Sequence, residues 1–234
     1  DKNGKLLRHK FTRGIMRSVA RLSYSEVQAA KDGSINKKTG PLLSKVIDPI
    51  YGAYRALLKS REKRHALELN LPENKVRFEK NGNIISIDKE KRFDSHKLIE
   101  EFMVVANVAA AISLKKKKSP SIFRNHDQPS LEKLEFLSKF LSAIGIPFSK
   151  KQISSPISFN QILREFKNTP NYEIISQMIL RTQSQAEYTN KNVGHFGLSL
   201  REYCHFTSPI RRYSDLLVHR AIVSELNPNN NLKE

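Results

Sequence analysis

Residues 205–220 read HFTSPIRRYSDLLVHR and form the most informative stretch of the chain. Ser208-Pro209 predicts the start of a helix, because proline at the first helical position has no N–H to leave unpaired and already has a helical φ. A hydroxyl residue before the proline can cap that end, and Arg211 and Arg212 follow within the first turn. A helix N-terminus beside guanidinium groups favours a phosphate. The alternative is an ordinary capped helix with solvated arginines.

This helix is expected to run to about residue 226 and to have two faces. Arg211, Asp215 and His219 are spaced four residues apart and share one face. A packed side beside such a polar side is typical of a helix that lines a cleft, and a solvated salt-bridge face is the alternative. The order Arg before Asp is the weaker one for an isolated helix, so intrahelical pairing explains it less well. The predicted apolar stripe consists of Ile210, Tyr213, Leu217 and Ala221.

The chain is strongly basic. Its 234 residues include 41 Lys and Arg against 23 Asp and Glu, which gives a formal net charge of +18. Such an imbalance on a folded chain indicates a polyanionic partner, either nucleic acid or an acidic membrane surface. The hydrophobic content of 38% is enough for a real core in one large domain or two small ones.

The sequence argues against a membrane partner. The longest apolar stretch, residues 102–114, is interrupted by Asn107 and Ser113 and is too short to span a bilayer. No signal-peptide pattern is found at the N-terminus. The single cysteine, Cys204, excludes an internal disulfide and fits a reducing cytoplasm. We therefore expect a cytoplasmic protein that binds nucleic acid.

The first residues predict an orphaned turn. Residues 1–4, Asp-Lys-Asn-Gly, read as a hairpin turn, followed by a strand over residues 5–11. A hairpin turn joins two strands, yet nothing precedes this one, and the chain lacks an initiating methionine. We expect a truncation on the N-terminal side.

The rest of the pattern predicts a mainly helical α+β domain with short antiparallel hairpins. A Ser25-x-x-Gln28 capping box opens a short helix, and Asn81-Gly82 closes a hairpin between residues 76–78 and 84–87. Residues 123–127 are expected in a loop. Further helices are expected over residues 42–65 with a kink or restart at Asp48-Pro49, from Asp94 or Ser95 to Lys115–Lys118, from Ser130 to Gly145, over residues 161–166, and from Thr169-Pro170 to about Tyr188.

Polar residues on the long central helix leave two interpretations open. Glu100 and Asn107 are seven residues apart and share a face, with Glu101 one step round. These side chains can hydrogen-bond ribose hydroxyls, which both donate and accept. Asn107, which lies among alanines and valines, is equally well explained as a satisfied core amide.

No local metal site is predicted. The seven histidines show no ligand spacing, and cysteine clusters are absent. Hard-metal catalysis on phosphodiesters normally needs clustered carboxylates, but no two aspartates are close in this sequence.

A family resemblance covers nearly the whole chain. The stretch at residues 205–220 resembles the signature of the ribonuclease II superfamily, and within it the ribonuclease R type. The other motifs that follow in family order are residues 11–24, 96–103 (HKLIEEFM), 123–127 (FRNHD), 178–181, 186–188 and 194–198.

The resemblance implies processive hydrolysis of single-stranded RNA from the 3′ end to nucleoside 5′-monophosphates, with Mg²⁺ as cofactor. It implies that Arg211 contacts the scissile phosphate as a catalytic residue and that Tyr24 lies along the RNA path. Glu101, or in second place Glu100, corresponds to the residue that holds the terminal ribose. Arg124, Arg212 and Tyr213 complete the RNA-binding residues that we expect.

The chain departs from the family pattern in what it lacks. The Asp-rich segment that holds the metal, the cold-shock-like domains and the C-terminal OB-type domain are not found in it. Residues 1–234 match only the C-terminal portion of the RNB catalytic domain. We therefore expect an exoribonuclease portion that is inactive unless the missing half completes it, in trans for example. The alternatives are a non-catalytic basic RNA-binding module and a split or decayed gene product that folds poorly.

Overall fold

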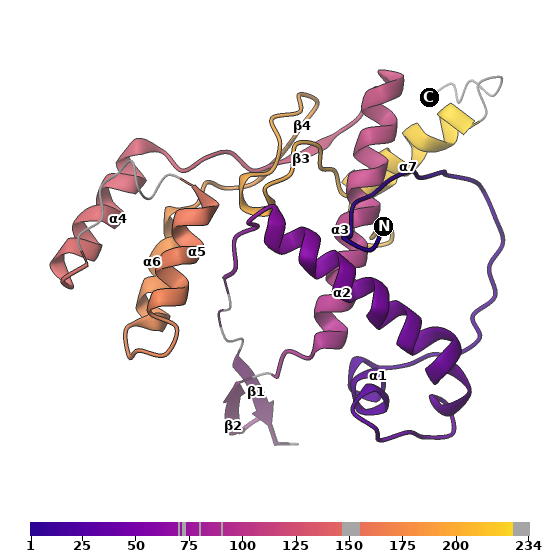
Figure 1. The fold of residues 1–234 in the computed structure, drawn as a ribbon, viewed down its shortest axis with the longest axis horizontal. Coiled ribbons are helices and arrows are strands. Elements are labelled where there is room, and N and C mark those ends of the chain that lie inside the picture. Colours follow the sequence, from indigo (N-terminus) through magenta and orange to yellow (C-terminus); the bar gives the residue numbers. More distant parts are fainter. Residues whose placement is uncertain (70, 72–73, 80, 90, 147–154, 227–234) are drawn as a thin grey trace.

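The computed structural model describes residues 1–69, 71, 74–79, 81–89, 91–146 and 155–226. Helices dominate, and the described strands form two separate antiparallel pairs, which confirms the predicted α+β class (Figure 1). The elements are α1 (Tyr24–Lys31), a 3-10 turn (Gly40–Leu42), a π-helical turn (Leu43–Ile47), α2 (Asp48–Lys63), β1 (Asn74–Phe78), β2 (Ile84–Lys89), α3 (Asp94–Lys117), β3 (Phe123–Asn125), α4 (Leu131–Ala143), α5 (Pro156–Glu165), α6 (Tyr172–Thr182), β4 (Glu187–Thr189), a 3-10 turn (Phe196–Leu198) and α7 (Tyr213–Leu226).

One core cluster joins α1, α2 and the N-terminal half of α3. Tyr51 and Tyr54 of α2 and Leu98 of α3 are each at most 5% exposed. Pro49 lies in the first turn of α2, directly after the π-helical turn. The helix predicted over residues 42–65 is confirmed, with its restart at the proline.

A second cluster joins the C-terminal half of α3 to β3 and α7. Leu114 of α3, Cys204 and Val218 of α7 are all buried in it. α3 ends where Lys118 adopts a left-handed φ of 55°, after three lysines that interact favourably with the negative end of the helix dipole.

A third cluster is formed by α4, α5 and α6, which lie to one side of α3 in Figure 1. Ser130 caps α4 by accepting from the backbone N–H of Lys133, as predicted. α5 begins earlier than predicted, because Ser155 caps it and Pro156 occupies its first position. α6 ends well before the predicted Tyr188, since β4 leaves the helical path to pair with β3. That pairing also converts part of the loop predicted at residues 123–127 into a strand.

The predicted hairpin is confirmed as β1 and β2, with Val76 opposite Ile87. It projects away from the helices in Figure 1. Large apolar side chains are exposed on both of its faces, among them Phe78 at 60% and Ile87 at 61%.

The strand predicted over residues 5–11 does not form. The preceding turn is present, and Gly4, with φ of +73°, donates its N–H to the Asp1 carbonyl at 2.9 Å. Residues 5–22 then run without helix or strand as one extended segment, which we call the N-terminal strap. Phe11 anchors it by packing edge-on against Phe206, with 5.3 Å between the ring centroids. A strand needs a neighbour to satisfy its backbone, and the described residues offer the strap none.

Other helix starts differ from the prediction as well, among them that of α6, which begins at Tyr172 and not at Thr169-Pro170. α1 is capped by a box of Ser23 and Glu26 instead of Ser25 and Gln28. α3 is not capped by Asp94 or Ser95, because the Ser95 hydroxyl donates to the Tyr24 carbonyl of α1 at 2.8 Å. The start of α7 is displaced as well, from Pro209 to Tyr213, because Asp215 binds Ser208 and Arg212 in the preceding turn.

Candidate nucleic-acid interface

A pocket of about 230 Å³ opens between the start of α1, one face of α3 and the segment after β4. We call it the α3 pocket. Tyr24 forms one wall and stacks on the His96 ring, with centroids 4.1 Å apart. Its lining consists of Tyr24, His96, Ile99, Glu100, Met103, Val104, Asn107, Tyr203, His205 and Arg212.

Asn107 is a satisfied core amide, which decides between the two interpretations of the central helix. Its side chain is 2% exposed, and its Nδ2 donates to the Tyr203 hydroxyl at 3.0 Å. Its Oδ1 accepts the Phe206 N–H at 2.9 Å. Both groups of the amide therefore hold the segment at residues 203–206 against α3.

Asp215 determines the conformation of the turn at residues 208–212. It is fully buried, its Oδ1 accepts the Ser208 N–H at 2.8 Å, and its two oxygens receive Arg212 as a bidentate pair at 2.7 and 2.8 Å. Burial alone would raise the pKa of Asp215, but the hydrogen bonds from Arg212 and Ser208 outweigh it and keep the pKa below its ordinary value. The carboxylate thus folds the residues after Pro209 into a turn, and α7 begins only at Tyr213.

This turn separates Arg211 from its predicted helical face. Arg211 is exposed, does not line the α3 pocket, and precedes α7, so Asp215 pairs with Arg212 instead. His219 lies elsewhere, stacked on Phe206 with its Nε2 2.8 Å from the Phe206 carbonyl. The predicted alignment of Arg211, Asp215 and His219 is therefore wrong.

The predicted apolar stripe of α7 is wrong too. Ile210 is 102% exposed and Tyr213 69%, whereas the buried positions are Asp215, Val218 and Ile222. The helix starts four residues later than expected, and its buried face includes the one aspartate that a hydrophobic pattern assigns to solvent. Tyr213 is exposed and does not line the α3 pocket, and its RNA contact stays a prediction.

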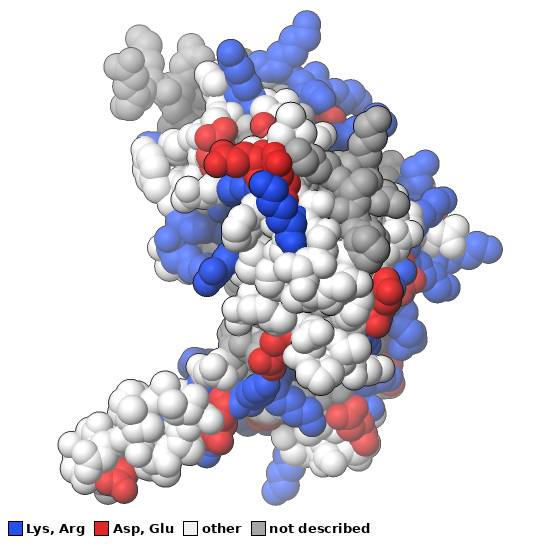
Figure 2. Space-filling view, turned by 90° about the vertical axis from the view of Figure 1, so that its left-hand side faces the viewer, with Lys and Arg blue, Asp and Glu red and all other residues white. Residues whose placement is uncertain are grey.

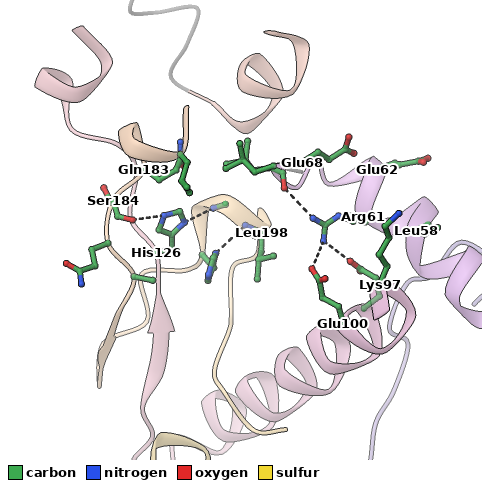
Figure 3. A pocket seen from close by; sticks show the side chains of 18 of the residues that line it. Leu58, Arg61, Glu62, Glu68, Lys97, Glu100, His126, Gln183, Ser184 and Leu198 are labelled. Atoms are coloured by element: carbon green, nitrogen blue, oxygen red, sulfur yellow. Dashed lines mark hydrogen bonds and ion pairs between the residues drawn. The ribbon is translucent and has the colours of Figure 1, made fainter. Parts of the chain in front are cut away.

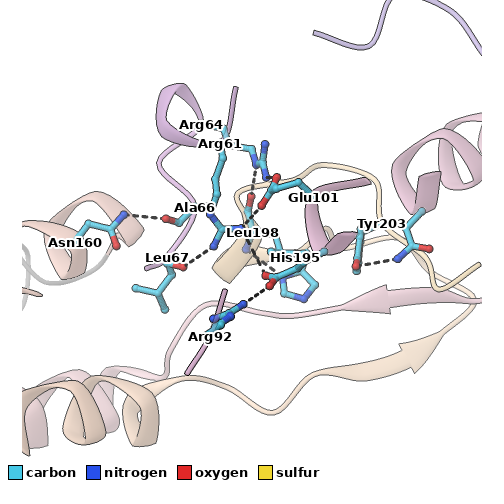
Figure 4. A network of polar contacts seen from close by, with 12 residues as sticks. Arg61, Arg64, Ala66, Leu67, Arg92, Glu101, Asn160, His195, Leu198 and Tyr203 are labelled. Carbon is cyan, nitrogen blue, oxygen red and sulfur yellow. Dashed lines mark hydrogen bonds and ion pairs between the residues drawn. The ribbon is translucent and has the colours of Figure 1, made fainter. Parts of the chain in front are cut away.

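Glu101 lies in a buried clamp between two arginines (Figure 4). It is 3% exposed, its Oε1 accepts from Arg61 at 2.7 Å, and its Oε2 accepts from Arg64 at 3.3 Å. Arg61 also donates to the Leu67 carbonyl and Arg64 to the Leu198 carbonyl. These bonds tie α2, α3 and the turn before residue 199 together.

Glu100, in contrast, is half-buried and lines the α3 pocket. It pairs with Arg92 and lies 4.0 Å from Arg61. Of the two adjacent carboxylates, Glu100 is therefore the one placed beside Tyr24 and Arg212. Sequence reasoning missed the arginine clamp; its only signal was the basic end of the helix now seen as α2.

Arg124 is half-buried and its contacts are internal. Its Nη1 donates to the Ala186 carbonyl at 3.0 Å, and its guanidinium lies over the Tyr188 ring at 4.7 Å. Tyr188 in turn meets His205, its hydroxyl 2.7 Å from the imidazole Nδ1. Arg124 thus reaches the α3 pocket through two other side chains.

A larger cavity of about 630 Å³ lies between the start of α3 and the α4–α6 cluster (Figure 3). On its wall, His126 Nδ1 accepts the Gly197 N–H at 2.9 Å, and its Nε2 faces the Ser184 carbonyl. Burial lowers the pKa of His126, and it lowers that of His195 to about 3. Both imidazoles are therefore neutral at pH 7, and they position the 3-10 turn beside β3.

Charge is uneven on the surface. In Figure 2, lysine and arginine side chains spread along much of the outline, whereas acidic side chains form a few small groups. Within the ranges that the structure describes, no three His, Cys, Asp or Glu side chains gather into a metal-binding group. No helix among the same residues is long and apolar enough to cross a membrane.

The comparisons with known proteins define the class. The RNB domain family model matches residues 1–228, so the chain belongs to the RNB domain family. The curated relatives that its sequence matches include ribonuclease R of two bacteria. It is 39% identical over 224 residues to ribonuclease R of Vibrio parahaemolyticus and 38% identical over 221 residues to that of Escherichia coli. These matches cover 95% and 94% of this chain but 27% of each relative, so the chain spans about a quarter of their length.

Solved structures agree. Mycoplasma genitalium RNase R in complex with ribose methylated single-stranded RNA superposes with a TM-score of 0.82 at 28% identity, over 91% of this chain and 34% of that one. The same protein in complex with double-stranded RNA gives 0.83 at 28% identity, over 91% and 38%. Yeast Ssd1, a pseudonuclease, shares the fold alone, with a TM-score of 0.63 at 18% identity, over 91% of this chain and 26% of that one.

Proposed function

We propose that this chain forms part of a cytoplasmic 3′-to-5′ exoribonuclease of the ribonuclease R type and supplies one wall of its RNA-binding site. The observation that carries the proposal is the α3 pocket, which places Tyr24, Glu100 and Arg212 side by side in a chain that matches the RNB family over residues 1–228. The relatives whose structures match include RNase R bound to single-stranded RNA.

Each of these residues has chemistry that suits RNA. The Tyr24 ring, supported by stacking on His96, offers a face to a base. The Glu100 carboxylate can accept from ribose hydroxyls. Arg212 uses its Nε and Nη2 on Asp215, which leaves its Nη1 for a phosphate. We further propose that the exposed Arg211 stabilises charge on the scissile phosphate.

In this proposal, Mg²⁺ is a cofactor of the complete enzyme, and the aspartates that hold it lie outside the described residues. The described residues do not fit a metal site, because Asp215 is fully used by Arg212 and Ser208, and Glu101 by two arginines. We derive no metal-dependent step from them. We infer that the isolated chain binds RNA without hydrolysing it, and that an aspartate-bearing half, in cis or in trans, completes the enzyme.

The test is to incubate the purified chain with uniformly labelled single-stranded RNA and Mg²⁺. We expect salt-sensitive retention of the RNA and no release of nucleoside monophosphates. Release that Arg211→Ala abolishes would contradict the inactivity of the isolated chain. Addition of the aspartate-bearing part of Escherichia coli ribonuclease R then tests completion in trans.

The second candidate is a non-catalytic RNA-binding module. The observations that favour it are the net charge of +18 and the lack of a metal-binding group among the described residues. The two candidates differ in the trans experiment. A module retains RNA whether or not the aspartate-bearing part is present and releases no monophosphate in either case.

A further inference from the structure

Arg124, Tyr188 and His205 form a contiguous chain of side chains that ends at the α3 pocket. The Arg124 guanidinium lies 4.7 Å from the centre of the Tyr188 ring, which is within cation–π range. The Tyr188 hydroxyl is 2.7 Å from His205 Nδ1. His205 lines the α3 pocket, and Tyr188 does not. The three residues come from β3, β4 and the segment before α7, so the fold brings this chain together over long sequence distances.

The contact with Tyr188 determines which imidazole nitrogen carries the proton. Burial, followed by the charge of Arg212, lowers the pKa of His205 to about 4, so the ring is neutral at pH 7 and has one N–H. A phenol hydroxyl has one hydrogen to give, and its oxygen lone pairs are delocalised into the ring, whereas an unprotonated imidazole nitrogen is a strong acceptor. Tyr188 therefore donates to Nδ1, and the N–H of His205 is at Nε2.

The Nε2 edge of His205 is available to a ligand. The hydrogen bonds of the described residues give Nδ1 a partner and give Nε2 none. The two nitrogens lie on different edges of the ring, so the edge away from Tyr188 is the one that His205 can present to the pocket it lines. Arg212 lines the same pocket, and no hydrogen bond within the described part of the chain uses its Nη1. The lining of this pocket therefore includes two donor side chains, one of them cationic, and such donors favour an anionic acceptor.

We propose that His205 is an RNA-binding residue that donates from Nε2 to a backbone phosphate oxygen in the α3 pocket, and that Tyr188 is a positioning residue that fixes its tautomer and orientation. This inference rests on the proposed function, since it assumes that the α3 pocket takes RNA. The inference also gives Arg124 a role. Its guanidinium holds the Tyr188 ring in place and does not itself contact the RNA.

Amide substitutions separate binding from structure. Gln at position 205 keeps an N–H donor near the place of Nε2 but loses the acceptor that Nδ1 offers to Tyr188. Asn at position 205 keeps an amide group near the place of Nδ1 but has no donor near the place of Nε2. The affinity for a 5′-fluorescein oligoadenylate of about ten nucleotides is measured by anisotropy, with EDTA present and salt fixed. We expect His205→Asn and His205→Ala to weaken binding about tenfold or more, and His205→Gln to stay within about threefold of the wild type.

The control variants are His65→Gln, an exposed histidine that lines neither cavity, and Tyr172→Phe on α6, matched to Tyr188→Phe. We expect neither control to change affinity and Tyr188→Phe to weaken it. Circular dichroism confirms the fold of each variant. The opposite pattern, in which Asn restores binding and Gln does not, would mean that the Tyr188 contact is only a structural clip and would overturn the inference.

A matched oligodeoxyadenylate distinguishes the ligand atom. A contact to phosphate predicts the same loss of affinity for DNA and RNA, and a loss confined to RNA would overturn the phosphate assignment. Wild-type protein that retains no RNA contradicts the proposed function itself. Equal retention of RNA by the wild type and by the Ala, Asn and Gln variants at position 205 contradicts only this inference.

Discussion

At the scale of single residues, the hydrophobic pattern of the sequence does not predict which charged side chains are buried. Asp215 and Glu101 are both at most 3% exposed, and both are surrounded by guanidinium donors. The cost of removing one partner of such a pair is large, because the remaining charge stays buried without compensation. Glu100, the neighbour of Glu101 in sequence, is only half-buried, and its ion pair with Arg92 is half exposed. Stability and binding can therefore be tested separately at adjacent positions.

We expect Asp215→Asn to lower the free energy of unfolding by about 2–3 kcal/mol, at the low end of buried-pair losses because Arg212 keeps 23% of its side chain exposed. Asp48→Asn breaks an exposed pair with Lys31 and is expected to cost below about 1 kcal/mol. Urea unfolding followed by circular dichroism measures both. Equal losses for the two variants would contradict the role assigned to the buried carboxylate.

The adjacent glutamates give a paired prediction. Glu101→Gln leaves Arg61 and Arg64 without their carboxylate and is expected to lower the free energy of unfolding by about 3 kcal/mol or more. Glu100→Gln is expected to change stability by less than about 1 kcal/mol, since its pair with Arg92 is half exposed, but to weaken RNA retention. Loss of retention in a stably folded Glu101→Gln protein would return the ribose contact to Glu101.

His195 makes stability depend on pH. Its pKa is lowered to about 3 by burial, whereas an unfolded histidine has a pKa near 6.5, so the unfolded chain takes up the proton first as the pH falls. Folding stability from this group is fully present above pH ~6.5 and is lost progressively below it, by up to roughly 2 kcal/mol at pH 5. Urea unfolding at pH 7.5 and 5.0 should show a smaller pH effect in His195→Asn than in the wild type.

At the scale of elements, helix existence is readable from sequence but helix ends are not. The α3 and α4 patterns and the β1–β2 turn carry their signals within a few residues, and all three form. The errors occur where a partner distant in sequence decides. Asp215 delays α7, Ser95 donates to a carbonyl of α1 instead of capping α3, and β3 draws β4 out of the predicted helix. Tertiary hydrogen bonds outweigh local cap preferences of about 1 kcal/mol.

The candidate site follows the same division. The resemblance selected Tyr24 and Arg212, and both line the α3 pocket. It placed Glu101 before Glu100, whereas Glu100 is the one that lines the α3 pocket, because adjacent residues on a helix differ by a rotation that only packing fixes. It gave His205 no role, since the Tyr188 contact that orients it joins residues 17 positions apart.

At the scale of the whole molecule, the net charge of +18 sets how binding responds to salt. We expect the logarithm of the RNA association constant to fall linearly with the logarithm of salt concentration, by about 0.7 for each phosphate contact. Arg211→Ala should make that slope shallower by the amount that one phosphate contact contributes, about 0.7. Lys139→Ala, an exposed lysine on α4, should leave it unchanged. Retention that does not respond to salt would contradict phosphate-dominated binding.

The N-terminal strap makes the chain vulnerable at one defined place. Residues 5–22 have no helix or strand, and Lys5, Arg8, Lys10, Arg13, Arg17 and Arg21 are all exposed along them. Trypsin, which cleaves after lysine and arginine, should therefore nick the strap before any helix is cut. Cleavage after Arg21, the last of these residues, falls just before α1, and brief digestion followed by mass spectrometry should show a trimmed protein that keeps its helices.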